Sequence, residues 1–309
     1  MARIIICIAT CKRPSGLRRT LLSLAAQKTD HLLEILVADN DAQHREGLAV
    51  VETMIAEGYR WKLSSLLVGE RGIPFARNAL VEAALAREGV RYVAMLDDDE
   101  AASPEWIDTL VEAASRWDAD VVGGAVLRQM DRPAPSWAAL HPLLQAKRRG
   151  RSGIVDFVDS TANILVTAEA LRAMGGRPFD ERLALTGGED KQLFTRMRRA
   201  GFRFAWSDDA LVTELIPASR VTAKWLLMRG YRLGMTDMMV ERFHKGRLRT
   251  TLGELPRIAA GFLVGTIGAA ATLDQGKRVV RLGKLYRAAG KIAGLAGIPY
   301  EEYRKVHGA

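Results

Sequence analysis

The sequence predicts an α/β protein with a mixed, mainly parallel sheet flanked by helices. Short apolar runs alternate with stretches in which apolar residues recur every three or four positions, the pattern of strands and helices in turn. The runs end in polar residues on their carboxyl side, where open α/β sheets bind their ligands. The 309 residues are 48% hydrophobic and 26% charged, which is ordinary for a globular protein and leaves room for one large domain with an appendage, or for two domains.

Strands and helices are expected to alternate from the first residues onward. The strands lie in residues 3–10, 32–43, 61–89 and 91–96, and the third of these stretches also holds a glycine loop and a helix. Further helices are expected over 16–28, where Leu17, Leu21 and Leu24 share one face, and around 44–57. This order predicts parallel strands joined by crossover helices.

The carboxylates of residues 97–100, three aspartates and a glutamate, directly follow the fourth of these strands. Ser103 is expected to cap the next helix, with Pro104 as its first residue and Glu105 in its first turn. The dipole of that helix accounts for one or two carboxylates but not for four. Two interpretations remain: a solvated turn, or a site for a metal ion and phosphate at the end of a strand.

The alternation of strand and helix patterns becomes less regular after a strand expected over residues 120–127. Residues 128–153 hold three prolines and the basic run that begins at Lys147, which predicts a long mobile loop. A strand and a helix follow in 158–171. A helix that opens with Glu189 and Asp190, and a strand over 202–206, then resume the alternation.

Positive charge is concentrated near the C-terminus. From Arg220 to the end, 17 Lys and Arg stand against 6 Asp and Glu, a net charge of +11, whereas the 219 residues before it carry a net charge of −2. A near-neutral body with a basic tail predicts an anionic partner. No RNA-binding aromatic signature or DNA-reading motif is recognisable, so we expect an acidic membrane surface and no nucleic acid.

Two helices are expected in this basic region. Residues 258–273 carry no charge, but as a helix these 16 residues rise only about 24 Å, less than the roughly 30 Å of a bilayer's hydrocarbon core. Residues 276–297 predict a basic amphipathic helix that suits an anionic bilayer surface, or alternatively a helix packed on the body of the protein. Its apolar stripe comprises Leu282, Leu285, Ala289, Ile292 and Ala296, and its basic side comprises Lys277, Arg281, Lys284 and Lys291.

The chain contains two cysteines, Cys7 and Cys11. Both lie in or just after the first apolar run, and their spacing, without other cysteines or clustered histidines, is poor for a metal site. We expect reduced core or near-core thiols. Because no signal peptide is recognisable, we also expect a cytoplasmic chain.

Four polar motifs stand at expected strand or helix ends: ATCKRP at 9–14, VADND at 37–41, LDDDE at 96–100 and GGED at 187–190. A fifth, RGIPFARN at 71–78, places two arginines around a tight loop. Carboxylates that hold a hard divalent cation, arginines that meet phosphates and a separate carboxylate pair are the components of nucleotide-diphosphate chemistry. The sequence has no P-loop motif and no G-x-G-x-x-G motif, which argues against a P-loop ATPase and a dinucleotide enzyme.

In this order and spacing the motifs resemble glycosyltransferase family 2, the inverting enzymes with the GT-A (Rossmann-like) fold, over about residues 3–216. The aspartate triplet and the segment 187–206 are the most specific elements. Residues 213–234 resemble an arginine- and aromatic-rich segment of bacterial exopolysaccharide members. The resemblance implies a catalytic domain at 1–216, with a nucleotide-sugar half at about 1–125 and an acceptor half at about 126–216. It also implies a basic, helical, membrane-associated C-terminal region at 217–309.

The resemblance assigns roles residue by residue. Asp190 matches the catalytic base, and Glu189 beside it orients the acceptor. Asp99 matches the ligand of Mg²⁺ or Mn²⁺, and Glu214 stands near the place where many members carry a metal-binding histidine, although it could equally pair with Arg220. Cys11 replaces an aromatic residue, which puts base stacking there in doubt. Nucleotide binding is implied for Thr10, Arg13, Asp39, Arg71, Arg77, Asp97 and Asp98.

The implied reaction is the inverting transfer of a sugar from a nucleotide-sugar donor, expected to be a UDP-sugar, to a lipid-linked saccharide. Exopolysaccharide or related envelope glycan synthesis at the cytoplasmic face of the bacterial inner membrane is the expected setting. A lipopolysaccharide-core or glycolipid glycosyltransferase is the first alternative. A sugar-nucleotide nucleotidyltransferase is a second, but its glycine-rich N-terminal loop is missing. An inactive membrane-bound partner is a third, against which the intact aspartate triplet and Glu-Asp pair argue.

Overall fold

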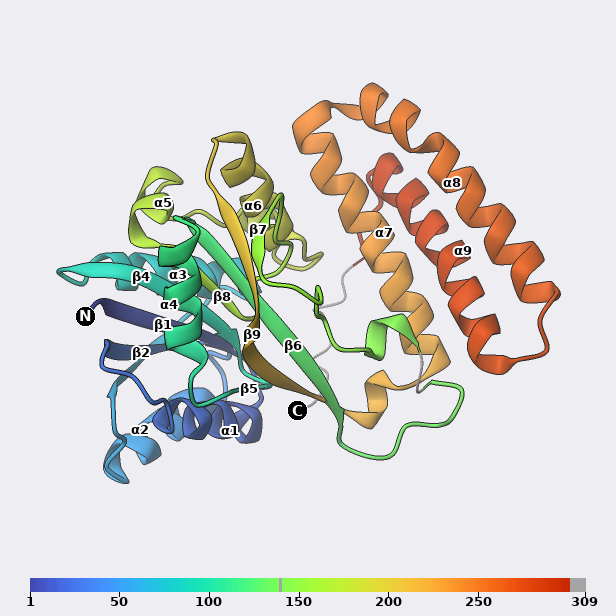
Figure 1. Cartoon of the computed structure of the whole chain (residues 1–309). Helices are drawn as coiled ribbons and strands as arrows, with labels where there is room; N and C mark the ends of the chain where they lie inside the picture. Colours follow the sequence, from blue (N-terminus) through green and yellow to red (C-terminus); the bar gives the residue numbers. More distant parts are fainter. Residues whose placement is uncertain (139–140, 301–309) are drawn as a thin grey trace.

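The computed structural model describes residues 1–138 and 141–300, and in them a single nine-stranded sheet forms the centre of the molecule (Figure 1). Its order is β3-β2-β1-β4-β8-β6-β9-β5, and β7 also pairs with β9. The strands are β1 Arg3–Thr10, β2 Leu32–Asp39, β3 Lys62–Leu67, β4 Val90–Asp97, β5 Glu100–Ala102, β6 Val121–Met130, β7 Gly153–Val155, β8 Ile164–Thr167 and β9 Phe204–Ile216.

The sheet is parallel in its first half and mixed in its second. Strands β3, β2, β1 and β4 are parallel neighbours, β8 runs antiparallel to both β4 and β6, and β6 and β9 are again parallel. This confirms the predicted mixed, mainly parallel α/β sheet. The parallel half brings the carboxyl ends of β1, β2 and β4 to one edge.

Helices cover both faces of the sheet, and the alternation within β1 shows why. Ile4, Ile6 and Ile8 enter the core on one face, while Ile5 and Cys7 enter the core on the other. The first face is covered by α1 Pro14–Ala25, α2 Glu46–Ala56 and α4 Trp106–Arg116, and the second by α3 Ile73–Leu85, α5 Ala168–Ala173 and α6 Glu189–Arg199. Three short 3₁₀ helices are Pro142–Leu144, Glu181–Leu183 and Ala218–Arg220.

Three long helices form a separate layer beside the sheet domain. They are α7 Ala223–Lys245, α8 Arg247–Ala270 and α9 Gln275–Ala296, and α8 is the outermost (Figure 1). Glycines allow close approach here: a Cβ at Gly234 of α7 would overlap the Arg287 carbonyl of α9, and one at Gly290 of α9 would overlap the Tyr231 carbonyl of α7. The helices therefore pack almost backbone to backbone.

Local predictions in the sheet domain need three corrections. Helix α4 begins at Trp106 without a side-chain cap, and Ser103 and Pro104 precede it in a turn. The three-residue strand β5 was not expected. The segment predicted as a long loop from 128 starts later, because β6 continues to Met130, and it includes a 3₁₀ helix and β7. Residues 139–140 lie outside the described residues.

The two helices predicted in the basic C-terminal region also differ from those of the structure. Helix α8 begins at Arg247 rather than at 258, and α9 packs between α7 and α8, so the alternative of a packed helix is correct for α9. Within the predicted apolar stripe Ile292 is 48% exposed, whereas the buried side of α9 is made largely of small residues. Those residues are Val279, Ala288, Gly290, Ala293, Gly294 and Leu295.

Among the described residues, no helix combines the length and the apolar character that crossing a bilayer requires. Strand β9 ends at Ile216, where the predicted catalytic domain ends. The division into domains stays a prediction, and residues 301–309 of the predicted C-terminal region lie outside the described residues.

Candidate active site

The carboxyl-end edge of the parallel strands opens onto a cleft of about 850 Å³. The register pairs Ala9 of β1 with Asp97 of β4, and Asp98 and Asp99 form the two-residue turn between β4 and β5. Helix α6 points its first residues, Glu189 and Asp190, into the same cleft. The aspartate triplet and the Glu-Asp pair, ninety residues apart in the sequence, therefore line one space.

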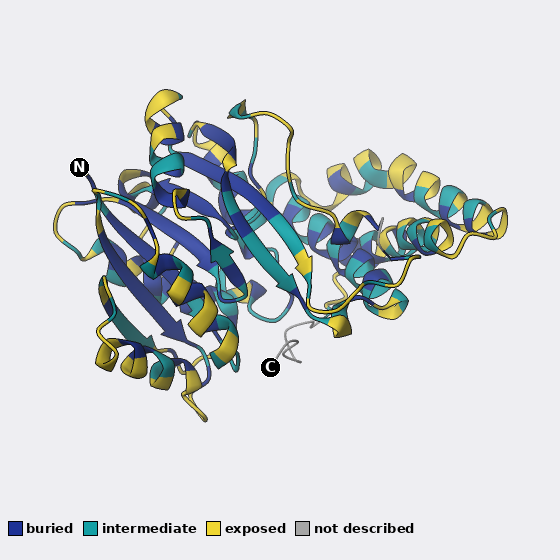
Figure 2. Cartoon of the chain, turned by 60° about the horizontal axis from the view of Figure 1, so that its bottom comes forward, coloured by how far each residue is buried: buried dark blue, intermediate teal, exposed yellow. Residues whose placement is uncertain are grey.

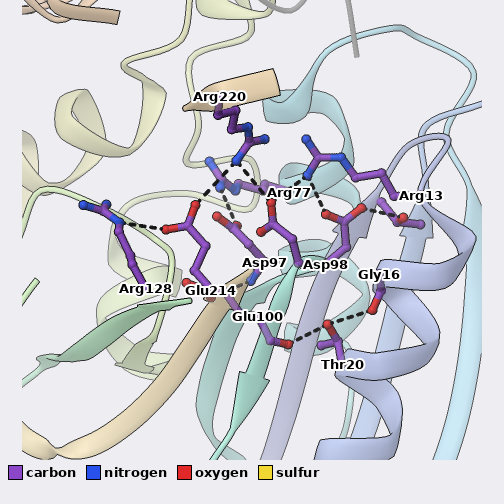
Figure 3. Close-up of polar contacts among 12 residues, drawn as sticks. Arg13, Gly16, Thr20, Arg77, Asp97, Asp98, Glu100, Arg128, Glu214 and Arg220 are labelled. Carbon is purple, nitrogen blue, oxygen red and sulfur yellow. Dashed lines mark hydrogen bonds and ion pairs between the residues drawn. The ribbon is translucent and has the colours of Figure 1, made fainter. Parts of the chain in front are cut away.

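The turn after β4 is held by residues from β1 and the loop after it. Thr10 Oγ1 donates to Asp98 Oδ2 at 2.7 Å, and one guanidinium nitrogen of Arg13 contacts Asp98 Oδ1 at 3.0 Å and Asp99 Oδ2 at 3.1 Å (Figure 3). Residues of the motifs ATCKRP and LDDDE thus contact each other. A guanidinium shared by two carboxylates offsets their mutual repulsion and fixes the turn.

Arg77 joins the two acidic elements. This side chain of α3 is 8% exposed and donates to Glu189 Oε1 at 2.5 Å and to Asp97 Oδ1 at 3.3 Å. Its placement is that of a bridge between the strand end and the start of α6. A direct contact of Arg77 with a nucleotide stays a prediction.

A second arginine bridge comes from the segment that leaves the sheet. Arg220 lies 3.4 Å from Asp99 Oδ2 and 3.5 Å from Glu214 Oε1, and Arg128 of β6 contacts Glu214 Oε2 at 3.0 Å (Figure 3). Glu214 therefore pairs with Arg220, which was one of the two expectations for it, and shares this arginine with Asp99. Its role as a metal ligand stays a prediction. Sequence reasoning did not include Arg128 or Arg220 among the site residues.

Of the predicted nucleotide-binding residues Asp39 and Arg71, only Arg71 lines the cleft. Asp39 is fully buried. Its Oδ1 accepts a hydrogen bond from the backbone N–H of Asp41, and its Oδ2 accepts from those of Gly47 and Leu48 at the start of α2. It does not line the cleft, so its predicted nucleotide contact stays a prediction. Arg71 and Cys11 do line the cleft. Both cysteines are free thiols, as expected, with Cys7 buried and Cys11 partly buried.

Glu189 and Asp98 are held in a way that favours their protonated forms. Burial, followed by the negative charge of Asp190, raises the pKa of Glu189 to about 7 against the opposing effect of Arg77. Burial also raises the pKa of Asp98 to about 6, although Arg13 opposes it. Glu189 Oε2 is buried and has no hydrogen-bond partner among residues 1–138 and 141–300. These side chains form a desolvated acidic cluster, which is typical of functional sites.

This cluster predicts that the cation-free protein is more stable at mildly acidic pH. Between the ordinary pKa values and those of the folded state, the unfolded chain ionises while the folded chain retains its protons, so the unfolding free energy falls as pH rises. From about pH 5.5 to about pH 8 we expect a loss on the order of 2 kcal/mol. The buried His141 and the partly buried His244, whose pKa values are lowered by desolvation, oppose this trend.

Denaturant unfolding at both pH values measures the effect, and Glu189→Gln serves as the comparison because it removes a carboxyl whose pKa is raised to about 7. The variant is expected to lose less stability than the wild-type protein between these two pH values. An equal slope in both proteins would contradict the assignment.

The cleft has a wall that sequence reasoning did not place. Trp225, Arg229, Arg232 and Asp237 of α7 line it opposite the strand ends, with Lys191 of α6 and Arg287 of α9. Arg220 and Arg229 both lie about 6 Å from the Trp225 ring centre, and Asp237 pairs with Lys191 at 2.5 Å and with Arg287 at 2.7 Å. The arginine- and aromatic-rich segment 213–234 was the only signal for this wall.

A divalent cation fits this site only together with a ligand. Among the described residues, no three His, Cys, Asp or Glu side chains are arranged to hold a metal ion by themselves. Asp99 and Glu214 nevertheless approach the same nitrogen of Arg220. Mg²⁺ in proteins is commonly held by one or two carboxylates plus substrate phosphates and water. The two carboxylates therefore suit a cation that arrives with a diphosphate.

Comparison with known proteins places this geometry among sugar-transferring enzymes. A curated relative, the succinoglycan biosynthesis protein ExoM of Rhizobium meliloti (strain 1021), is 32% identical over 246 residues, covering 77% of this chain and 75% of the relative. The mannosyltransferase PcManGT from Pyrobaculum calidifontis in complex with GDP-Man and Mn²⁺ has a similar structure, with a TM-score of 0.60 at 18% identity over 94% of this chain and 86% of that one.

S. aureus TarS in complex with UDP is a second structural neighbour, with a TM-score of 0.54 at 15% identity over 96% of this chain and 92% of that chain. At these identities the two structures show the fold, which is that of GT-A glycosyltransferases. The family model of glycosyl transferase family 2 matches residues 5–175, more than half of the chain. The chain is thus a member of glycosyltransferase family 2.

Proposed function

We propose that the protein is an inverting, metal-dependent glycosyltransferase that moves a sugar from a UDP-sugar to a hydroxyl of a lipid-linked saccharide. Exopolysaccharide or related envelope glycan synthesis is the proposed process, at the cytoplasmic face of the bacterial inner membrane. One observation carries the proposal: the aspartate triplet and Asp190 line the same cleft of about 850 Å³. The relative named for succinoglycan biosynthesis supports the process, and the UDP-bound neighbour supports the nucleotide.

The donor is proposed to bind at the strand ends. Thr10, Arg13 and Arg71 line this part of the cleft and would hold the nucleotide, with Asp97 and Asp98 toward the sugar. Asp99 and Glu214 would hold Mg²⁺ or Mn²⁺, which, when bound, neutralises charge on the diphosphate leaving group. Arg13 and Arg220 occupy these carboxylates in the structure. Each can exchange a carboxylate for a phosphate when the donor arrives.

The acceptor is proposed to bind between α6 and the side of the cleft formed by Trp225, Arg229, Arg232 and Asp237, which we call the α7 wall. Its hydroxyl oxygen attacks the anomeric carbon from the face opposite the diphosphate, the bond from that carbon to the diphosphate oxygen breaks, and Asp190 takes the hydroxyl proton. The configuration at the anomeric carbon inverts. Asp190 accepts a hydrogen bond from the backbone N–H of Lys191 through Oδ1 at 2.7 Å, which leaves Oδ2 for the acceptor.

The basic α7 wall favours an acceptor that carries phosphate. Arg229, Arg232 and Lys191 line the cleft on this side, within reach of a group that enters past Trp225. A saccharide on a lipid diphosphate would place its sugar at Asp190 and its phosphates against these cations.

The donor proposal predicts that UDP and Mn²⁺ together stabilise the protein. At about 100 times the Kd, bound ligand raises the melting temperature by on the order of 5 °C. Asp99→Asn is expected to keep the response to UDP alone and lose the additional response to Mn²⁺. Asp108→Asn, at a half-exposed carboxylate on α4, is the control.

Thermal-shift measurements with UDP, GDP, TDP and CMP, each with and without Mn²⁺, test this prediction. Absence of any nucleotide response in the wild-type protein would overturn the proposed function. A full Mn²⁺ response in Asp99→Asn would remove only the metal role of Asp99.

A further inference from the structure

Helix α8 presents an exposed row of large apolar side chains. Leu248, Leu252, Leu255, Leu263 and Ile267 are 56–72% exposed, and we call them the α8 apolar face. At 100° per residue these five positions fall within about a third of the helix circumference. Large apolar residues scattered singly over a surface are ordinary, but a continuous row along one helix indicates a binding surface.

The opposite side of α8 explains why this face is turned outward. Ile258, Gly261, Gly265 and Ala269 form the side that packs on the rest of the helical layer, and a Cβ at Gly265 would overlap Leu285 of α9. The G-x-x-x-G spacing of Gly261 and Gly265 thus serves packing within the chain. Figure 2 shows exposed residues along the outer helices, away from the sheet domain.

The polar groups of α8 do not interrupt the apolar face. Thr266 lies within the row, but its hydroxyl donates to the Phe262 carbonyl at 2.5 Å and needs no water partner. The acidic residue of the helix, Glu254, is 15% exposed and is held by Lys291 at 2.5 Å and Arg257 at 2.6 Å. From Leu252 to Ile267, covering the face with an apolar medium would therefore leave no charge of α8 unpaired inside it.

Cations stand at both ends of the face. Lys245, Arg247 and Arg249 are exposed at its start, and Lys277, Arg278 and Arg281 are exposed just beyond its end, in the first turns of α9. Residues 243–284 contain eight Lys and Arg against two Asp and Glu. Of these two acids, Glu254 is paired as described, and Asp274 accepts the hydrogen bond that caps α9.

We propose that the α8 apolar face binds an anionic lipid bilayer. The helix lies in the plane of the interface, the leucine row enters the boundary between headgroups and acyl chains, and the cations at both ends meet acidic headgroups. This differs from the sequence-based expectation, which assigned membrane contact to residues 276–297.

A second copy of the chain is a poorer match for this surface. A two-fold interface places the same surface against itself, so the cations at the two ends of one face would meet those of the other without acidic partners. An anionic bilayer satisfies the apolar row and the cations together. The inference extends the proposed function by giving the surface that would bring the cleft to a lipid-linked acceptor, but its test needs neither donor nor acceptor.

The experiment is cosedimentation of the full chain with vesicles of phosphatidylcholine, with and without phosphatidylglycerol. We expect binding to the anionic vesicles, reduced by about tenfold or more in the double variant Leu252→Gln/Leu263→Gln. We also expect a smaller reduction in Lys277→Gln/Arg281→Gln, which adding salt to the wild-type protein should reproduce. Leu22→Gln/Ile55→Gln is the matched control, because these side chains are 48% and 50% exposed on α1 and α2.

The outcomes separate this inference from the proposed function. No binding to anionic vesicles, or equal losses in the α8 and control variants, would overturn the inference. A concentration-dependent dimer that Leu252→Gln/Leu263→Gln dissociates would overturn it in favour of a second copy. The response to UDP and Mn²⁺ is measured on the same proteins: its retention in the α8 variant shows a folded catalytic domain, and its absence in the wild type counts against the proposed function alone.

Discussion

Asp190→Asn is expected to lower the rate of sugar transfer by about 10²- to 10⁴-fold, the range that general-base catalysis contributes. The amide is nearly isosteric but cannot take the proton of an acceptor hydroxyl. Asp190 lies at the start of α6 and lines the cleft together with the aspartate triplet, and its contacts do not include the triplet's arginine bridges. Binding of UDP should therefore be unchanged.

Single-turnover transfer at saturating donor, with UDP binding measured on the same protein, tests this assignment. Glu189→Gln is the informative comparison, because Glu189 contacts Arg77 and has a raised pKa of about 7. If Glu189 orients the acceptor, its variant loses acceptor affinity more than rate. A large loss of rate in Glu189→Gln, with turnover kept in Asp190→Asn, would transfer the base role to Glu189.

The sequence predicted the part of the site that strand order determines. Residues at the carboxyl ends of parallel strands must meet at one edge, so the sequence alone predicts that Thr10 and the triplet at residues 97–99 lie together. The β1–β4 register confirms this, because it pairs Ala9 with Asp97 and so places Thr10 beside the triplet. Asp190 followed from its motif, and the cleft confirms that it lies in the same space as the triplet.

What the sequence did not predict depends on contacts between segments far apart in the chain. Asp39 ends a strand like Asp97 does, but the N–H groups of Gly47 and Leu48 engage its oxygens, and no local pattern shows this. The α7 wall depends on how the helical layer docks on the sheet domain. The face of α9 was misassigned because a helix packed on two sides has two inward faces, whereas a single stripe assumes one.

The arginines of the site give a physical reason for this dependence on tertiary structure. Four arginines of the site come from four different parts of the chain, and each contacts at least one carboxylate that lines the cleft: Arg13, Arg77, Arg128 and Arg220. Without them, repulsion among desolvated carboxylates would favour protonation or opening of the turn. Arg220 also lies directly before α7, so the contact that neutralises Asp99 and Glu214 connects the strand ends with the helical layer.

Gly290→Ala and Gly283→Ala, two changes in the same helix, are expected to have opposite effects on stability. Alanine favours a helix over glycine by up to about 1 kcal/mol, and no described atom lies within 4 Å of a Cβ at Gly283, so Gly283→Ala should stabilise the protein. A Cβ at Gly290 overlaps the Tyr231 carbonyl of α7. Overpacking of this kind costs about 1–3 kcal/mol or more, so Gly290→Ala should destabilise it.

The functional consequence follows from what α7 carries. If Gly290→Ala forces α7 and α9 apart, Trp225, Arg229 and Arg232 move away from the cleft, while the strand ends that are proposed to hold the donor keep their own arginine contacts with Arg13 and Arg77. We expect transfer to the acceptor to fall and UDP binding to persist. Gly234→Ala, which meets the Arg287 carbonyl from the other helix, should reproduce both effects.

Thermal unfolding of the three variants, with transfer and UDP binding measured on each, tests both the predicted stabilities and the predicted loss of transfer. Equal stabilities of Gly290→Ala and Gly283→Ala would mean that the helices do not approach as closely as their glycines allow. Loss of UDP binding together with transfer would mean that the helical layer supports the donor site as well. Retained UDP binding with lost transfer would assign the α7 wall to the acceptor, because the two substrates would then depend on different parts of one cleft.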